Sequence, residues 1–213
     1  MRLTDWDHNA WYRPLLLRQV PVDAERVLDV GCGTGALARS LAERVPRVDG
    51  VDRSAVMIEE ARHLAPPNVM LHLADALTAD LPADTYDAVL SSSVLHHLDL
   101  AEALPRMARW LRPGGVLAAV ALPRIGLPRE LPVELAAAAT HHGLGLAFAG
   151  LRPLTGAHLL RHEPTHDAMP IVDPVLTTRE VRAESARLLP GARVRRLLLW
   201  RYLLTWRKPQ ICA

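Results

Sequence analysis

Val27-Leu28-Asp29-Val30-Gly31-Cys32-Gly33-Thr34-Gly35 is the stretch that decides the fold of this chain. A run of mostly branched apolar residues leads into three glycines at alternate positions, and an alanine- and leucine-rich segment with helical spacing follows. Glycines lack a Cβ atom, so a ligand can lie against their main chain, and the first amides of the next helix face the same space. The stretch predicts a strand, a ligand-binding turn and a helix. A glycine turn without a ligand is the alternative.

Three further apolar runs repeat this pattern along the chain. They lead to Asp52, Asp75 and Ser91 in turn. An acid about 20 residues after the glycine turn is where nucleotide-binding α/β folds contact the ribose hydroxyls. Small or acidic residues at successive strand ends therefore predict a ligand across the carboxyl edge of a parallel sheet.

Five motifs together carry a resemblance to a known family. They are residues 27–35, Val51-Asp52-Arg53-Ser54, Ala74-Asp75-Ala76, residues 86–98 with Leu95-His96-His97-Leu98, and Leu111-Arg112-Pro113-Gly114-Gly115. In this order and spacing the chain resembles the class I S-adenosylmethionine-dependent methyltransferases, in the branch that methylates small molecules. The resemblance implies an α/β fold with a Rossmann-like, doubly wound sheet of seven strands. It also implies a mostly parallel sheet with a C-terminal antiparallel hairpin, and an inserted lid after strand five.

The length of 213 residues indicates one domain. Its expected parts are an N-terminal flap (1–19), a cofactor-binding core (20–122), an inserted lid (123–177), and a C-terminal helix and hairpin (178–213). The lid is expected because residues 152–177 read as an irregular stretch too long for an ordinary loop. Packing of residues 123–177 against the sheet edge or a second subunit is the alternative.

The charge and composition of the chain indicate which classes of partner it is expected to bind and where it is expected to be located. A formal net charge of +2 indicates neither a nucleic-acid nor a membrane partner, and two cysteines, Cys32 and Cys212, are too few for a disulfide framework. No run of about 18 uncharged apolar residues and no signal peptide is recognisable, so a cytoplasmic location is expected. We expect a monomer or homodimer.

The spacing of apolar residues, prolines and caps predicts the local structure. Expected helices cover residues 36–45, 55–64 after a Ser54 cap, 100–111 after an Asp99 cap, 131–146, and 178–189 after a Thr178 cap. A turn at Pro113-Gly114-Gly115 should precede a strand at 116–122, and strands at 192–200 and 202–208 should form the hairpin. Residues 1–19 should form a helix with Trp11 and Leu15 on one face, either packed on the sheet edge or acting as a flap.

The resemblance implies S-adenosylmethionine as cofactor and S-adenosylhomocysteine as product. The positions it assigns to cofactor binding are Asp29, Gly31, Cys32, Gly33, Asp52, Arg53, Asp75, Ala76 and Ser91. Within this set, Asp52 is expected to accept from both ribose hydroxyls and Asp75 from the adenine amino group. Ser91 and its neighbours are expected to line the floor near the methionine part.

Methyl transfer from a sulfonium is a one-step displacement, so the protein supplies position, removal of water and, for some acceptors, a base. The first histidine of the pair, His96, and His166 of the lid are the candidate catalytic residues. The candidate substrate-binding residues are His8, Tyr12, His97 and His162. A histidine pKa of about 6.5 suits a base at neutral pH. The alternative is that the pair only shapes the loop.

The sequence therefore predicts a metal-independent enzyme that transfers a methyl group to an oxygen or nitrogen of a small molecule. His162 and His166 have a metal-like spacing, but Pro164 argues against a regular helix there. Ser91-Ser92-Ser93-Val94 replaces the motif of enzymes that methylate DNA amino groups. A non-catalytic protein that binds S-adenosylmethionine or S-adenosylhomocysteine, and an NAD(P)-dependent oxidoreductase, are the remaining alternatives.

Overall fold

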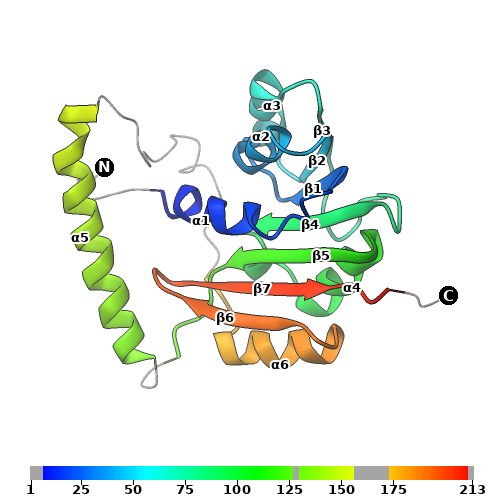
Figure 1. Cartoon of the computed structure of the whole chain (residues 1–213). Helices are drawn as coiled ribbons and strands as arrows, with labels where there is room; N and C mark the ends of the chain where they lie inside the picture. Colours follow the sequence, from blue (N-terminus) through cyan, green and yellow to red (C-terminus); the bar gives the residue numbers. More distant parts are fainter. Residues whose placement is uncertain (1–6, 127–129, 156–172, 211–213) are drawn as a thin grey trace.

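Seven strands form one sheet in the order β3-β2-β1-β4-β5-β7-β6 (Figure 1). The structure is a computed structural model that describes residues 7–126, 130–155 and 173–210, with side chains left aside at 149–155. The strands are β1 Arg26–Val30, β2 Arg47–Asp52, β3 Val69–Leu73, β4 Tyr86–Ser92, β5 Leu111–Ala121, β6 Arg193–Leu197 and β7 Arg201–Arg207. The first five pair in parallel, while β7 runs antiparallel to both β5 and β6. The predicted seven-stranded, doubly wound sheet with a C-terminal hairpin is confirmed.

Helices cover both faces of this sheet. They are α1 His8–Leu17, α2 Ala36–Ala42, α3 Ala55–Leu64, α4 Leu100–Trp110, α5 Leu131–Thr155 and α6 Thr178–Leu188, with a short 3-10 turn, η1, at Leu95–His97. One core cluster joins the sheet to α4 and α6 through Met107, Trp110 and Val181. The other joins it to α1 and α2 through Leu16 and Leu41. These two layers leave the carboxyl edge of the parallel strands free to hold a ligand.

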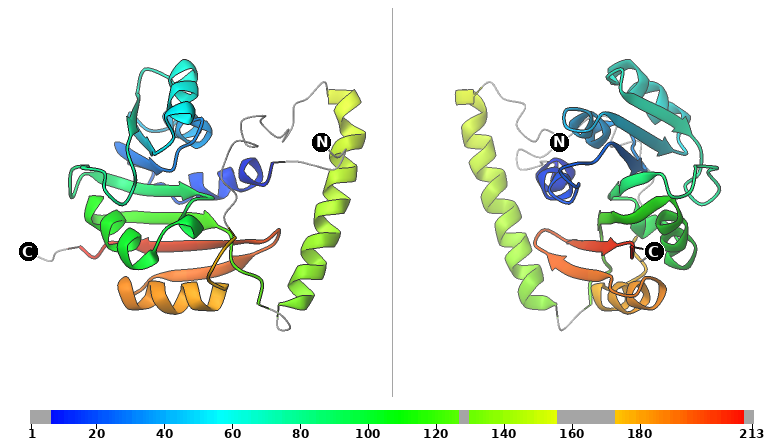
Figure 2. Two further views of the ribbon diagram at one scale, coloured as in Figure 1. Left: turned by 180° about the vertical axis from the view of Figure 1, so that it is seen from behind. Right: turned by 45° about the vertical axis from the view of Figure 1, so that its right-hand side comes forward.

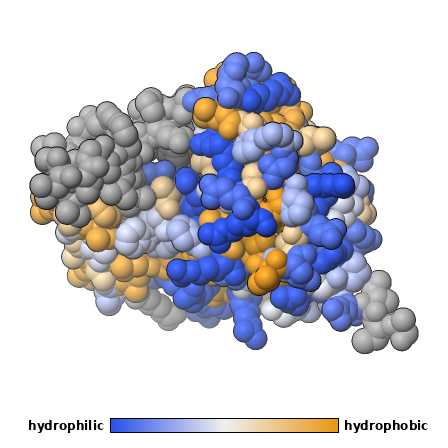
Figure 3. All heavy atoms as spheres, turned by 45° about the horizontal axis from the view of Figure 1, so that its top comes forward, coloured by the Kyte–Doolittle hydropathy of each residue, from blue (hydrophilic) through white to orange (hydrophobic). Residues whose placement is uncertain are grey.

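Helix α5 lies beside this core rather than within it, next to α1 and the end of the hairpin in both views of Figure 2. It is longer than predicted, because it continues to Thr155 through the stretch expected to be irregular from Arg152. Leu131, Leu135 and Leu146 remain exposed on it. In Figure 3, hydrophobic surface gathers on the side of the molecule where α5 lies.

Helix ends follow the expected chemistry with one correction. Ser54 caps α3 by accepting from the Met57 amide, and Asp99 caps α4 by accepting from the Ala101 amide. The cap of α6 is Thr177, not Thr178, because Thr177 and Glu180 form a reciprocal capping box.

Two other predictions are corrected in detail. Residues 113–115 lie within β5, which begins at Leu111 and pairs with Tyr86 before a register shift, so the expected turn is part of a longer strand. In α1 we expected Trp11 and Leu15 to share the packed face, but the buried residues are Tyr12 and Leu16. The buried face of the helix therefore lies one residue further along the chain than predicted.

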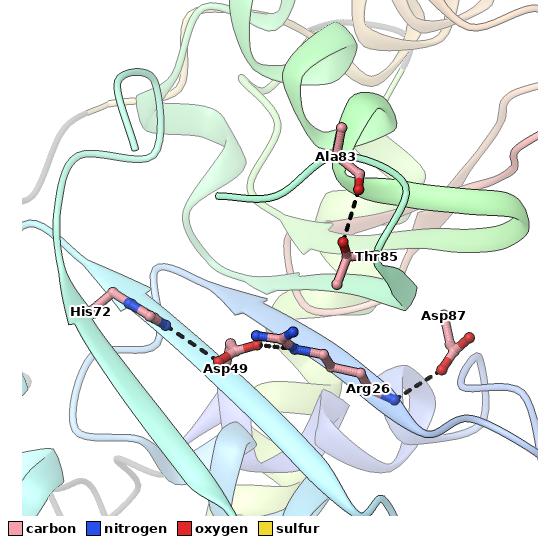
Figure 4. A network of polar contacts seen from close by, with 6 residues as sticks. All are labelled: Arg26, Asp49, His72, Ala83, Thr85 and Asp87. Carbon is pink, nitrogen blue, oxygen red and sulfur yellow. Dashed lines mark hydrogen bonds and ion pairs between the residues drawn. The ribbon is translucent and has the colours of Figure 1, made fainter. Parts of the chain in front are cut away.

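A polar network holds the amino-terminal half of the sheet (Figure 4). Buried Asp49 on β2 pairs with Arg26 on β1 at 2.7 Å and contacts His72 on β3 at 3.3 Å. Asp87 on β4 accepts from the Arg26 amide at 2.9 Å and pairs with Arg112. Because Asp49 and Asp87 are almost fully buried, removing the arginine that pairs with either of them would leave an uncompensated buried charge at the edge opposite the free carboxyl ends.

Candidate functional site

A cavity opens at the carboxyl ends of β1 to β4. It brings together most of the residues singled out from the sequence. Those that line it are Asp29, Gly31, Cys32, Gly33, Asp52, Arg53, Asp75, Ala76 and His97. They come from four strand ends far apart in the chain, as expected for the ligand edge of a doubly wound sheet.

The glycine turn is held against the ends of two neighbouring strands. The Gly31 amide donates to Val51 O at 2.7 Å, and the Gly33 amide donates to Asp52 Oδ2 at 2.9 Å. Gly31 has a φ of +71°, and a Cβ atom there would lie 2.2 Å from Val94 Cγ2. Only glycine fits this position, so the turn forms a close cradle of backbone for a ligand.

Two carboxylates on the adjoining strand ends are oriented by backbone amides. Asp52 Oδ1 accepts from the Ser54 amide at 2.8 Å, in addition to its bond with Gly33. Asp75 Oδ1 accepts from the Leu77 amide at 2.8 Å. Each carboxylate keeps further lone pairs for a ligand's hydroxyl or amino groups.

Asp29 is the most buried charge in the cavity wall, with 1% of its surface exposed. Neither of its carboxyl oxygens has a hydrogen-bond partner of good geometry among the described residues. Burial raises the pKa of Asp29 to about 7, and the charge of Asp52 adds to this rise. An orphaned buried carboxyl beside a glycine cradle fits a cationic ligand such as S-adenosylmethionine, which carries an ammonium and a sulfonium group.

Ser91 lies behind the cavity wall. It is fully buried, and its hydroxyl donates to Val30 O at 3.0 Å. The next two residues, Ser92 and Ser93, line the cavity instead. The hydroxyl of Ser93 donates to Asn9 Oδ1 at 2.5 Å, which ties the cavity floor to α1.

Helix α1 covers part of the cavity with residues that the sequence reasoning missed. Asn9 and Arg13, four residues apart on one helical face, line it together with Asp7. His8 and Tyr12, one position earlier, are outside the lining. The sequence signal that could have identified Asn9 and Arg13 is their spacing of four residues in a helix that begins after Asp7. Asp7 caps this helix, because its Oδ1 accepts from the Asn9 amide at 2.7 Å.

His8 and Tyr12 contact the hairpin and α5. His8 Nε2 lies 3.1 Å from His141 Nδ1, and its ring centroid is 6.0 Å from that of Trp200. The Tyr12 hydroxyl donates to Leu198 O, and burial raises the Tyr12 pKa to about 12. These contacts connect α1 to the later part of the chain.

The histidine pair stands between two cavities. His97 lines the first cavity and also a second one, which lies beside η1, residues 174–176 and α6 and which His96 lines as well. The two rings are 4.0 Å apart. Burial, with the nearby His97 and Arg201, lowers the pKa of His96 to about 3, and burial lowers the pKa of His97. Both imidazoles are therefore neutral at pH 7.

Some candidate residues lie outside this description. His162 and His166 fall in 156–172, outside the described residues. In the described part of the chain, no group of three or more His, Cys, Asp or Glu residues is arranged to hold a metal ion. Within those same ranges, no helix has both the length and the apolar character needed to cross a membrane.

Comparison with known proteins agrees with this geometry. The methyltransferase domain family matches residues 27–115. Over nearly the whole length, the chain is 38% identical to an uncharacterized methyltransferase of Mycobacterium tuberculosis strain H37Rv, covering 96% of this chain and 98% of that protein.

Two further comparisons are informative. Aklanonic acid methyltransferase DauC of Streptomyces sp. strain C5 is 43% identical over 106 residues, which cover 46% of this chain and 48% of that protein. The solved complex of DhpI with S-adenosylhomocysteine superposes with a TM-score of 0.62 at 20% identity, covering 95% of this chain and 84% of that one. The latter likeness concerns the fold alone.

Proposed function

Because the chain belongs to the class I S-adenosylmethionine-dependent methyltransferase family, we propose that it methylates an oxygen or nitrogen of a small-molecule acceptor without the help of a metal ion. The observation that carries this proposal is the pair of adjacent cavities that share His97. The first has the polar strand-end residues suited to the cofactor. The second offers a neighbouring, largely apolar space for an acceptor, and the similarity to aklanonic acid methyltransferase supports a small molecule.

When bound, S-adenosylmethionine supplies an electrophilic methyl group on a sulfonium. The backbone of Gly31, Cys32 and Gly33 would lie against its amino-acid and ribose portions. Asp52 would accept from the ribose hydroxyls, and Arg53 would flank the adenine.

Asp75, with the Ala76 amide, would bind the adenine amino group. The orphaned carboxyl of Asp29 would face the cationic end and gain from its charge.

The chain's own residues then position the acceptor and exclude water. With a pKa of about 3, His96 is neutral but weakly basic, so it suits a hydrogen bond that orients the acceptor better than early removal of its proton. His97, between the cavities, would contact the acceptor near the transferred methyl group. Asn9 and Arg13 of α1 support the role of the N-terminal segment as a flap.

Residues 123–177 complete the proposed cover as a lid, with His162 and His166 retained as acceptor-contacting and catalytic candidates. The support comes from α5, which reaches α1 through His8 and His141. In this arrangement the flap and the lid touch, so closing one would affect the other.

Calorimetric titration of Asp52→Ala tests the cofactor site. Loss of charge-assisted hydrogen bonds should weaken S-adenosylmethionine binding by roughly 2–4 kcal/mol. Asp80→Ala, at an exposed residue outside the cavity lining, is the matched control and should bind like the parent. Unchanged affinity in Asp52→Ala would remove the ribose assignment, and tighter binding of NAD than of S-adenosylmethionine by the parent would contradict the proposal.

A further inference from the structure

Tyr202 on β7 is a buried side chain whose hydroxyl is unused. It belongs to the core cluster that also contains Leu95, Leu100 and Val181, and only 1% of its surface is exposed. Among the described residues, no group makes a hydrogen bond with its hydroxyl. Buried tyrosines usually find a partner for this group, because leaving a buried donor unpaired costs free energy. The Tyr202 hydroxyl therefore suits a partner from outside the described part of the chain.

The other two tyrosines differ from Tyr202. The hydroxyl of Tyr12 donates to Leu198 O. Tyr86, at the start of β4, is fully buried and has an unpartnered hydroxyl, but it lines neither of the two cavities. Tyr202 lines the second cavity. Of the three tyrosines of the chain, all within the described residues, only Tyr202 combines an unpartnered hydroxyl with a position in that cavity wall.

The backbone places Tyr202 at the carboxyl edge of the sheet. Tyr202 pairs with Ala121, the last residue of β5, and the following residue, Leu122, lines the same cavity. His96 and His97 line it as well, and their Nδ1 atoms are buried without a partner among the described residues. His97 also lines the cofactor cavity, whereas Tyr202 does not. A molecule that contacts His97 beside the cofactor can therefore reach Tyr202 only with another of its atoms.

The rest of the second cavity favours an uncharged ligand. Its volume of about 660 Å³ suits a small molecule, and most of its wall is apolar. No described lysine or arginine lines it. Three carboxylates do, and all three have partners: Asp99 caps α4 and Glu180 completes the capping box of α6. The third, Glu184, pairs with Arg187 at 2.6 Å. An anion would be repelled by these groups, and a cation would find them already engaged.

We propose that Tyr202 donates a hydrogen bond to an uncharged oxygen of the methyl acceptor, a hydroxyl or carbonyl oxygen other than the methylated atom. Burial raises the pKa of Tyr202, so its hydroxyl keeps its proton at pH 7 and is available as a donor. Tyr202 is then a specificity-determining residue that selects a largely apolar molecule with such an oxygen. This inference rests on the proposed function, because it takes the second cavity as the acceptor site.

The test compares Tyr202→Phe with Tyr86→Phe, a control that removes the same hydroxyl from a buried residue outside both cavities. Each protein is saturated with S-adenosylhomocysteine and titrated with acetophenone, an uncharged ketone, or with benzoate, an acid of similar size, in ligand-observed NMR. Acetophenone should bind Tyr202→Phe about 3- to 10-fold more weakly than the parent, as expected for the loss of one net hydrogen bond. It should bind Tyr86→Phe like the parent. Equal affinity for Tyr202→Phe and the parent, or tighter binding of benzoate than of acetophenone, would overturn the proposal.

A second readout reports on the hydroxyl itself. When Cζ of every tyrosine carries an NMR-active carbon isotope, the chain gives three tyrosine signals, and the one missing from Tyr202→Phe belongs to Tyr202. Acetophenone should shift this signal, while the signals of Tyr12 and Tyr86 stay in place. Binding of acetophenone without a shift of the Tyr202 signal would contradict the proposal.

Stability and cofactor binding separate this role from others. Without ligand, Tyr202→Phe should unfold at the temperature of the parent or slightly above it, because the hydroxyl that it removes has no partner in the described chain. A lower Tm would reveal a structural hydrogen bond and overturn the proposal. Tyr202→Phe should bind S-adenosylhomocysteine within about threefold of the parent in calorimetry. Failure of the parent to bind S-adenosylhomocysteine would count against the proposed function, whereas normal cofactor binding without acetophenone binding would count against the role of Tyr202 alone.

Discussion

Substitution of Asp29 by asparagine should stabilise the protein without its cofactor in a way that depends on pH. The Asp29 pKa is raised from an ordinary 3.8 to about 7 in the folded state, mainly by burial. Between these two values the unfolded chain has ionised this group while the folded chain still holds the proton. The contribution of Asp29 to stability is therefore greatest below pH 4, falls as pH rises toward 7, and stays reduced above it.

The magnitude follows from the width of that window. At 1.36 kcal/mol per pH unit, a rise from 3.8 to about 7 corresponds to at most about 4 kcal/mol. Part of the rise in pKa comes from the charge of Asp52, and this part becomes smaller when Asp52 is itself screened. We therefore expect Asp29→Asn to raise the free energy of unfolding by about 2–4 kcal/mol at pH 8. At pH 4 the two proteins should differ little, because both carry a neutral group at residue 29.

Urea unfolding followed by circular dichroism at pH 4, 6 and 8, without cofactor, measures this difference. The exposed Asp80→Asn is the control and should match the parent at every pH, because surface substitutions usually change stability by less than about 0.5 kcal/mol. A pH-independent difference between Asp29→Asn and the parent, or a loss of stability at pH 8, would refute the reasoning about Asp29.

Three further predictions concern the cradle, the lid and metal ions. Gly31→Ala should lose about 2–5 kcal/mol of stability in urea unfolding, from its positive φ and the clash with Val94, and adding Val94→Ala should recover only the clash. Replacing residues 127–173 by a short Gly/Ser linker should leave cofactor binding within a few-fold in calorimetry but abolish most methylation of the native acceptor, whereas retained turnover would contradict the lid. Added EDTA should leave activity unchanged, and a loss restored by Mg²⁺ or Zn²⁺ would show that a metal takes part.

The sheet and the first cavity could be predicted because their signals are local. The short stretch that begins at Val27 contains the signals for a strand, a glycine turn and a helix, while Asp52 ends β2 and Asp75 follows the end of β3 by two residues. Parallel pairing then brings those ends to one edge. Such reasoning needs the order of the strands but no knowledge of how distant segments pack.

The phase of α1 and the setting of Tyr202 could not be obtained in this way. A shift of one residue turns a helix by about 100°, and this separates Asn9 and Arg13 from the predicted His8 and Tyr12. In the sequence Tyr202 is one of several aromatic residues in the hairpin. Its setting depends on β7 entering the sheet beside β5, which places it in the wall of the cavity that His96 also lines. Thr177 displaced Thr178 as the helix cap because the capping box requires Glu180 three residues later.

The insertion of β7 between β5 and β6 also has a consequence for how the protein is made. Ala121 pairs with Tyr202, so one edge of β5 has no partner until the ribosome has added some 80 more residues. During that interval the cofactor-binding half can assemble, while β5 presents an open strand edge able to pair with another chain. We therefore expect nascent chains stopped before β7 to aggregate, and we expect the step that closes this edge to limit the rate of productive folding.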